Sequence, residues 1–203
     1  MKNRTNVRWL TQIALLAAIL LVLNYTPLGY LQVGPLSASL LTVPVAIGAI
    51  TMGPAAGALL GALFGATSFM QALQGKSVMG GALFAVSPAG YFVVSVIGRV
   101  LMGLCVGFIF AALQKVLPKK EKLTCYIAAF CAPFLNTVFY MGLLVAIFYN
   151  SEFVQNLAAK KGATNPLMFI VLVVGVQAVI EWCVCCAVAG TITLPVRKYM
   201  KNN

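Results

Sequence analysis

The run from Pro166 to Leu194 decides the fold of this chain, because it is long and apolar enough to cross a lipid bilayer. It reads PLMFIVLVVGVQAVIEWCVCCAVAGTITL and holds one carboxylate, Glu181. At a rise of about 1.5 Å per residue, Glu181 lies about 22 Å along such a helix, near the middle of the membrane. A charge at that depth costs roughly 2.5–3.5 kcal/mol on insertion scales. We therefore expect Glu181 to face the interior of a helix bundle and to have a partner there.

The composition of the whole chain is that of an integral membrane protein. Of its 203 residues, 62% are hydrophobic and 8% are charged, whereas a soluble domain has about 45–50% apolar and about 25% charged residues. At about 20 residues per span, six membrane helices fit this length and eight do not. The sequence therefore predicts one integral membrane domain over residues 1–203, an all-α bundle of six transmembrane helices. The predicted spans are residues 9–25, 36–52, 55–73, 88–117, 123–149 and 166–194.

The cations flank the predicted spans, so the net charge of +11 does not indicate nucleic-acid binding. Ten of them form three groups: Lys2, Arg4 and Arg8; Lys115, Lys119, Lys120 and Lys122; and Arg197, Lys198 and Lys201. Cationic loops stay in the cytoplasm, and six spans with both termini cytoplasmic place all three groups there. Lys76, Lys160 and Lys161 are then outside, and Arg99 lies within the membrane.

The sequence predicts no metal site, no cofactor and no enzymatic activity. Cys183 and Cys186 have C-x-x-C spacing, but they lie in an apolar run, and the chain contains no histidine and no aspartate. Without them the chain lacks the commonest general base and has too few hard ligands for a metalloenzyme. A channel would need polar faces along a whole pore, and the inner halves of these spans lack them.

Polar groups from three predicted spans fall at matching depths. Arg99 lies about 16 Å from the outer end of its span, and Asn136 about 20 Å from the inner end of its own. Tyr140 and Gln177 lie one turn outward from Asn136 and Glu181. These five residues predict a polar pocket that opens to the outside, closed by the loops at 26–37, 74–87 and 151–165. The alternative is a purely structural Arg99–Glu181 ion pair.

Small residues mark two helix faces that allow close packing. The first span carries Ala14 and Ala18 on one face, which suits either an internal contact or a partner helix. The third span carries Gly57, Gly61 and Gly65, each four residues apart. We interpret this glycine row as an internal packing seam.

Several short motifs resemble one known family over nearly the whole chain. They are ALLAA at 14–18, TPLGY at 26–30, GPLS at 34–37, TVPV at 42–45, GPAAGA at 53–58 with Gly61 and Gly65, RVLMG at 99–103, LNTVF at 135–139 and the helix of Glu181. The chain resembles the substrate-binding S-component of energy-coupling factor (ECF) vitamin transporters, and among these it is most similar to the pantothenate-type members.

The resemblance implies a multi-pass protein of the prokaryotic plasma membrane that captures a small water-soluble vitamin from outside. It further implies a membrane T-component, docked through Ala14, Ala17 and Ala18, and two cytoplasmic ATPase subunits as partners. The implied ligand-binding residues are Arg99, Asn136, Tyr140, Gln177 and Glu181, with Tyr30, Gln32 and Gln74 as lid candidates. Two alternatives stay open: another vitamin or precursor as ligand, or a membrane scaffold protein that transports nothing.

Overall fold

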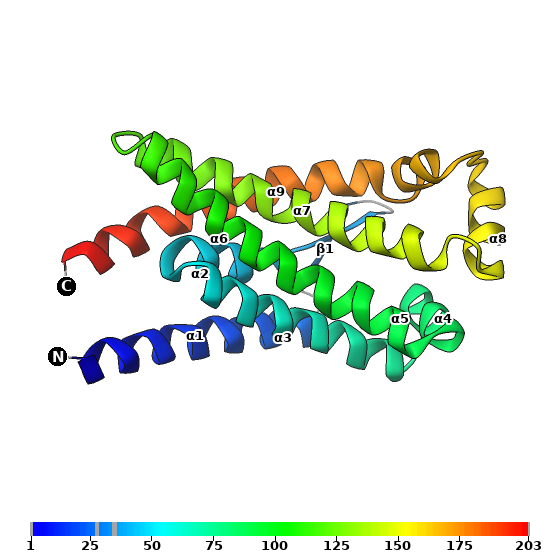
Figure 1. Cartoon of the computed structure of the whole chain (residues 1–203), viewed down its shortest axis with the longest axis horizontal. Helices are drawn as coiled ribbons and strands as arrows, with labels where there is room; N and C mark the ends of the chain where they lie inside the picture. The colour runs from blue at the N-terminus through cyan, green and yellow to red at the C-terminus, as the bar shows by residue number, and fades with distance from the viewer. Residues whose placement is uncertain (1, 27–28, 34–35, 203) are drawn as a thin grey trace.

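The structure, a computed structural model, describes residues 2–26, 29–33 and 36–202, and the side chains of residues 7–26, 29 and 39–200. The predicted loop at 26–37 is described only in part, because four of its residues lie outside the described ones: Pro27, Leu28, Gly34 and Pro35. The chain forms a long helical bundle with one small hairpin (Figure 1). Its elements are α1 (Lys2–Tyr25), β1 (Tyr30–Val33), β2 (Leu36–Ser39), α2 (Thr42–Met52), α3 (Pro54–Leu73), α4 (Val78–Val86), α5 (Pro88–Phe92), η2 (Val93–Ile97), α6 (Gly98–Val116), α7 (Glu121–Phe148), α8 (Glu152–Lys161) and α9 (Pro166–Asn202).

Five stretches of helix in the described chain are long and apolar enough to cross a membrane. They are Val7–Tyr25, Pro54–Leu73, Pro88–Val116, Glu121–Phe148 and Pro166–Met200. Five of the six predicted spans correspond to these helices, with boundaries within a few residues, except that α1 begins and α9 ends beyond the apolar run.

The predicted span 36–52 is wrong as a single membrane helix. Residues 36–39 are a β-strand, and α2 has only 11 residues, about 16 Å against a hydrocarbon core of about 30 Å. The antiparallel β1–β2 hairpin pairs Tyr30 with Ser39 and Val33 with Leu36. Pro44, predicted inside the span, falls in the first turn of α2, where its missing N–H costs no hydrogen bond.

Helix α2 lies at the centre of one half of the bundle. Every residue from Thr42 to Ile50 is buried, and α2 contacts α1, α3, α6, α7 and α9. Its apolar side chains join those of the surrounding helices in one hydrophobic core, and a second core lies under α4 and α8 in the other half. The polar residues of interest lie between these two apolar cores.

The predicted glycine seam is confirmed as an internal contact between α3 and the long helix that runs from α5 to α6. A Cβ at Gly57 would overlap the Gly103 carbonyl oxygen, and a Cβ at Gly61 would overlap that of Arg99. One turn further, a Cβ at Gly65 would lie 2.5 Å from the Ser95 oxygen. The two backbones therefore meet directly, which fixes the position of Arg99 against α3.

The predicted loops at 74–87 and 151–165 each contain a short helix. The hydroxyl of Ser77 accepts a hydrogen bond from the Gly80 amide and begins α4, and Ser151 does the same for α8 through Val154. Serine in this capping position satisfies an otherwise unpaired amide. The glycines and polar residues of these segments led to the prediction of loops, and the two capping serines were not recognised.

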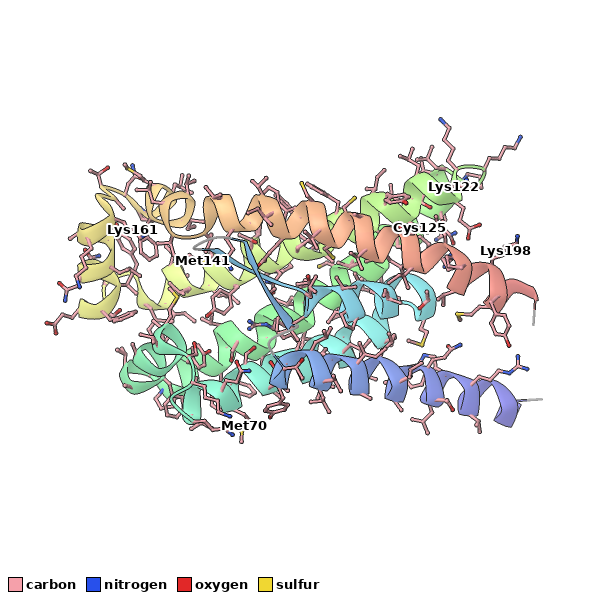
Figure 2. All side chains as sticks on the ribbon, turned by 180° about the vertical axis from the view of Figure 1, so that it is seen from behind. Met70, Lys122, Cys125, Met141, Lys161 and Lys198 are labelled. Atoms are coloured by element: carbon pink, nitrogen blue, oxygen red, sulfur yellow. The ribbon has the colours of Figure 1, made fainter. Side chains whose placement is uncertain are left out.

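Both termini lie at one end of the bundle (Figure 1). Lys122 and Lys198 lie at that same end, and Lys161 lies at the opposite end (Figure 2). Arg197 joins three helices there: its Nε is 3.0 Å from Glu121 Oε1, its Nη1 donates to the Ile50 carbonyl at 2.9 Å, and its guanidinium lies 4.5 Å from the centre of the Phe110 ring.

Candidate functional site

The site is built around Glu181, which is 7% exposed and lies in the middle of α9. Its Oε1 accepts two hydrogen bonds, from the backbone amide of Ser39 at 2.8 Å and from Gln177 Nε2 at 3.1 Å. Gln177 comes from the preceding turn of α9, as its spacing predicts. Ser39 is the last residue of β2, so the buried carboxylate ties the hairpin to α9.

Arg99 is held between two aromatic rings near the start of α6. Its guanidinium carbon is 4.2 Å from the centre of the Phe64 ring and 5.0 Å from that of Tyr140, distances at which a cation is attracted to a ring face. Its Nη1 donates to the Ser95 carbonyl at 2.8 Å. Ser95 belongs to the π-helical turn η2, and such turns often occur at functional sites.

A cavity of about 270 Å³ lies between α3, α4, α7, α9 and the end of β2. Four of the predicted site residues line it: Asn136, Tyr140, Gln177 and Glu181. The buried Oδ1 of Asn136 makes no hydrogen bond within the described part of the chain. A buried acceptor without a donor is costly, and a bound ligand with an N–H or O–H group would remove that cost. Met141, another lining residue, lies in the half of the bundle nearer Lys161 (Figure 2).

The other predicted residues lie around or away from this cavity. Arg99 adjoins it through Phe64 and Tyr140, which both line it. Gln74 is exposed at the end of α3 and is not among the lining residues. Tyr30 and Gln32 lie on β1, but their side chains are outside the described part of the structure.

Sequence reasoning missed several side chains that line the cavity: Ser39, Phe64, Met79, Thr137, Met141, Val173, Val174 and Ala178. Thr137 and Ala178 directly follow predicted site residues, so proximity in sequence could have suggested them. Met79 comes from α4, within a predicted loop, and Ser39 from a predicted membrane helix. No sequence signal marked either one.

The described residues include no group of three or more histidine, cysteine, aspartate or glutamate side chains placed to hold a metal ion. What the site offers is one cation between rings, one carboxylate, two amides and a phenol around a small cavity, inside an apolar membrane bundle. This arrangement is typical of a membrane protein that binds a small polar molecule.

Comparison with known proteins identifies the family. Residues 8–193 match the family described as ECF transporter, substrate-specific component, and a comparison with curated proteins finds no match. The match covers nearly the whole chain, so this protein belongs to the ECF transporter substrate-specific component family. Members of this family are membrane-embedded, substrate-binding subunits of ECF importers rather than enzymes, and they work with a T-component and ATPases.

Proposed function

We propose that this chain captures pantothenate from outside the cell for an ECF importer, and that the cavity beside Glu181 is the binding site. The observation that carries the proposal is the convergence of Asn136, Tyr140, Gln177 and Glu181 on one cavity, with Arg99 at its border. A cavity of about 270 Å³ suits a small metabolite.

The chemistry of pantothenate fits the groups at this site. The ligand carries one carboxylate, one amide and two hydroxyls. The Arg99 guanidinium suits the carboxylate as a two-pronged donor. Asn136 and Gln177 suit the amide, and the Asn136 Oδ1 needs a donor such as a ligand N–H or O–H. Glu181 suits a hydroxyl, since its Oε2 is a strong acceptor and its bonds to Ser39 and Gln177 both use Oε1.

The charges at the two ends of the bundle support a proposal for its arrangement in the membrane. Both termini and the labelled cations Lys122 and Lys198 lie at one end, which we assign to the cytoplasm. The chain then crosses the membrane six times, and the second crossing combines the hairpin with α2. Non-helical backbone is tolerated at membrane depth where it is covered by protein or lines a water-filled cavity. The cavity beside β2 provides such a place at the outer side of a prokaryotic plasma membrane.

The T-component is proposed to dock on α1. Ala14 and Ala18 are exposed on this helix, whereas Ala17 packs partly against the core. Small exposed residues let another helix approach closely. Replacing Ala18 with Trp is expected to block assembly with the T-component but to leave ligand binding by the chain alone unchanged.

Binding of radiolabelled pantothenate to the chain purified alone in detergent tests the function. Saturable submicromolar binding is the expected result. Binding of another vitamin from a parallel panel, with none of pantothenate, would keep the family function and reject the ligand. No binding of any vitamin would favour the scaffold alternative, in which Arg99 and Glu181 serve only the packing of the bundle.

A further inference from the structure

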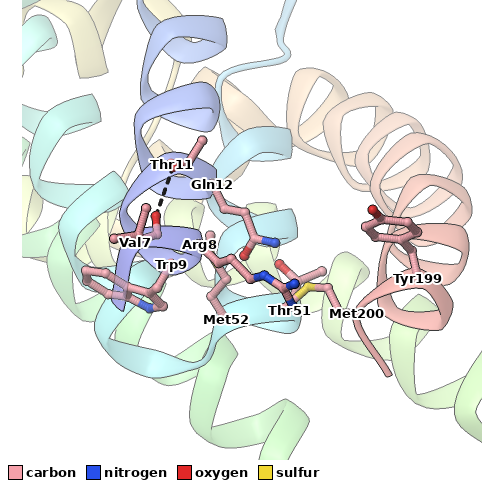
Figure 3. Close-up of a pocket in the computed structure, with 9 residues that line it drawn as sticks. All are labelled: Val7, Arg8, Trp9, Thr11, Gln12, Thr51, Met52, Tyr199 and Met200. Atoms are coloured by element: carbon pink, nitrogen blue, oxygen red, sulfur yellow. Dashed lines mark hydrogen bonds between the residues drawn. The ribbon is translucent and has the colours of Figure 1, made fainter. Parts of the chain in front are cut away.

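A second hollow region lies at the end of the bundle that carries both termini, away from the cavity of Glu181. Two adjoining cavities, of about 660 and 330 Å³, share Gln12, Thr51, Met52 and Met200 among their lining residues. Together they form one groove between α1, the end of α2 and the end of α9, close to both termini. We call it the α1–α9 groove; Figure 3 shows its wider mouth.

Polar and apolar groups are separated along the α1–α9 groove. The mouth carries the cation Arg8 with the polar groups of Thr11, Gln12 and Tyr199. Arg8 extends from α1 toward Thr51 and Met200 (Figure 3). The deeper part is lined almost entirely by aliphatic side chains, and no acidic residue is among the described residues that line either part. The groove thus has a cationic polar opening and a hydrocarbon-like interior.

The length of the apolar part matches one leaflet of a bilayer. On α1 it is lined from Gln12 to Leu23, which spans about 16 Å at 1.5 Å per residue. Half of a hydrocarbon core of about 30 Å is about 15 Å. With Gln12 at the edge of the hydrocarbon, Arg8 lies one turn, about 6 Å, further out, at the level of the headgroups. A helix about 10 Å wide and equally long would fill roughly 1,250 Å³, so the apolar part, at about 330 Å³, is too small to enclose a helix.

We propose that the α1–α9 groove binds an anionic phospholipid, with its phosphate against Arg8 and one acyl chain along the apolar part between α1 and α2. A guanidinium pairs well with phosphate oxygens, and the described residues that line the groove add no carboxylate that would repel a phosphate. Ala14 and Ala18, the proposed docking residues, do not line this groove. The proposed lipid site is therefore distinct from the proposed vitamin site and from the alanines proposed for docking.

Quenching of tryptophan fluorescence by brominated lipids tests this proposal, because Trp9 lines the mouth. The chain has two tryptophans, and the second, Trp182, packs among Phe130 and Phe134. The variant Trp182→Phe leaves Trp9 as the single reporter. It is reconstituted in phosphatidylcholine vesicles that contain a small fraction of either phosphatidylglycerol or phosphatidylcholine brominated near the headgroup end of the acyl chains.

The brominated phosphatidylglycerol is expected to quench Trp9 several-fold more strongly than the same fraction of brominated phosphatidylcholine. Arg8→Gln should remove this difference and Arg8→Lys should keep part of it, whereas Lys161→Gln, at the opposite end, should have no effect. Ile192→Phe places a larger side chain in the apolar part, where Ile192 is 41% exposed. It should weaken quenching without unfolding the protein, which a thermal melt checks.

Equal quenching by the two lipids in the Trp182→Phe protein would overturn the proposal and leave the groove to a protein partner. A difference that persists unchanged in Arg8→Gln would also overturn it, because the preference would then arise from the general positive charge of this end. The headgroup comparison requires no change at Arg8, so it stands even if that variant folds poorly.

Discussion

Arg99 is the residue on which ligand recognition is expected to depend most. Its contacts with the Phe64 and Tyr140 rings hold the planar guanidinium near the cavity. Hydrogen bonds to charged groups contribute about 1.5–3 kcal/mol, so Arg99→Ala should weaken pantothenate binding about 10- to 150-fold. Arg99→Lys keeps the charge but loses the planar fork and ring stacking, and should recover only part of the affinity. Equilibrium binding of radiolabelled ligand measures both effects.

A matched control for Arg99 is Lys160→Ala, which removes an exposed cation from α8. This change should leave the affinity unaltered. Full-affinity binding by Arg99→Ala would contradict the assignment of Arg99 to the ligand carboxylate. It would then favour a purely structural role for this side chain.

Matching depths along helices was enough to predict the centre of the candidate site. Asn136, Tyr140, Gln177 and Glu181 do line one cavity, although their contact with ligand stays a prediction. Depth could not predict Ser39, because Ser39 contributes its backbone amide to Glu181 and every non-proline residue has such an amide. Nor could depth predict that Phe64 and Tyr140 would enclose Arg99, since that contact depends on how α3 and α7 are rotated.

Among the elements, the β1–β2 hairpin depends on α9 for its attachment at Ser39. In Glu181→Ala the Ser39 amide loses its acceptor, and hydrogen bonds to carboxylates are worth about 1.5–3 kcal/mol. We expect amide hydrogen exchange at Ser39 to become at least tenfold faster. Gln177→Ala, which leaves the Ser39 bond in place, should have a smaller effect. Unchanged exchange in Glu181→Ala would mean that strand pairing alone holds the hairpin.

The seam between α3 and α6 should tolerate no added methyl group. Gly61→Ala places a Cβ against the Arg99 carbonyl oxygen, and overpacking of this kind costs typically 1–3 kcal/mol. The matched control is Gly142→Ala on α7, where a Cβ meets nothing within 4 Å. Thermal unfolding in detergent should show a clear loss for Gly61→Ala and none for Gly142→Ala. Equal melting temperatures would show that the seam relaxes easily.

Hydrophobicity predicted the long helices well and failed for the second predicted span. Residues 36–52 are uncharged and mostly apolar, and a run of this kind suits a buried strand followed by a helix as well as one helix. The strand depends on pairing with β1 and on the bond to Glu181, which is 142 residues away from Ser39. Contacts so distant in sequence leave no trace in local periodicity.

At the scale of the whole molecule, the orientation in the membrane can be tested with single cysteines. We expect Lys161→Cys to react with a membrane-impermeant thiol reagent on intact cells, and Lys119→Cys to react only after the membrane is opened. The native cysteines lie within membrane-spanning helices, and the unsubstituted chain measures their background. Labelling of Lys119→Cys on intact cells would contradict cytoplasmic termini.

The buried helix α2 also has a consequence for the leakage of ions across the membrane. From Val43 to Ile50 its side chains are apolar or absent, and all of these residues are buried. A hydrated ion that entered the outer cavity would have to lose its water to pass this dry stretch, at a cost of many kcal/mol. We therefore expect vesicles crowded with this protein to hold a potassium diffusion potential as long as protein-free vesicles do. A cell could then hold many copies of this protein at low ligand concentration without losing its membrane potential.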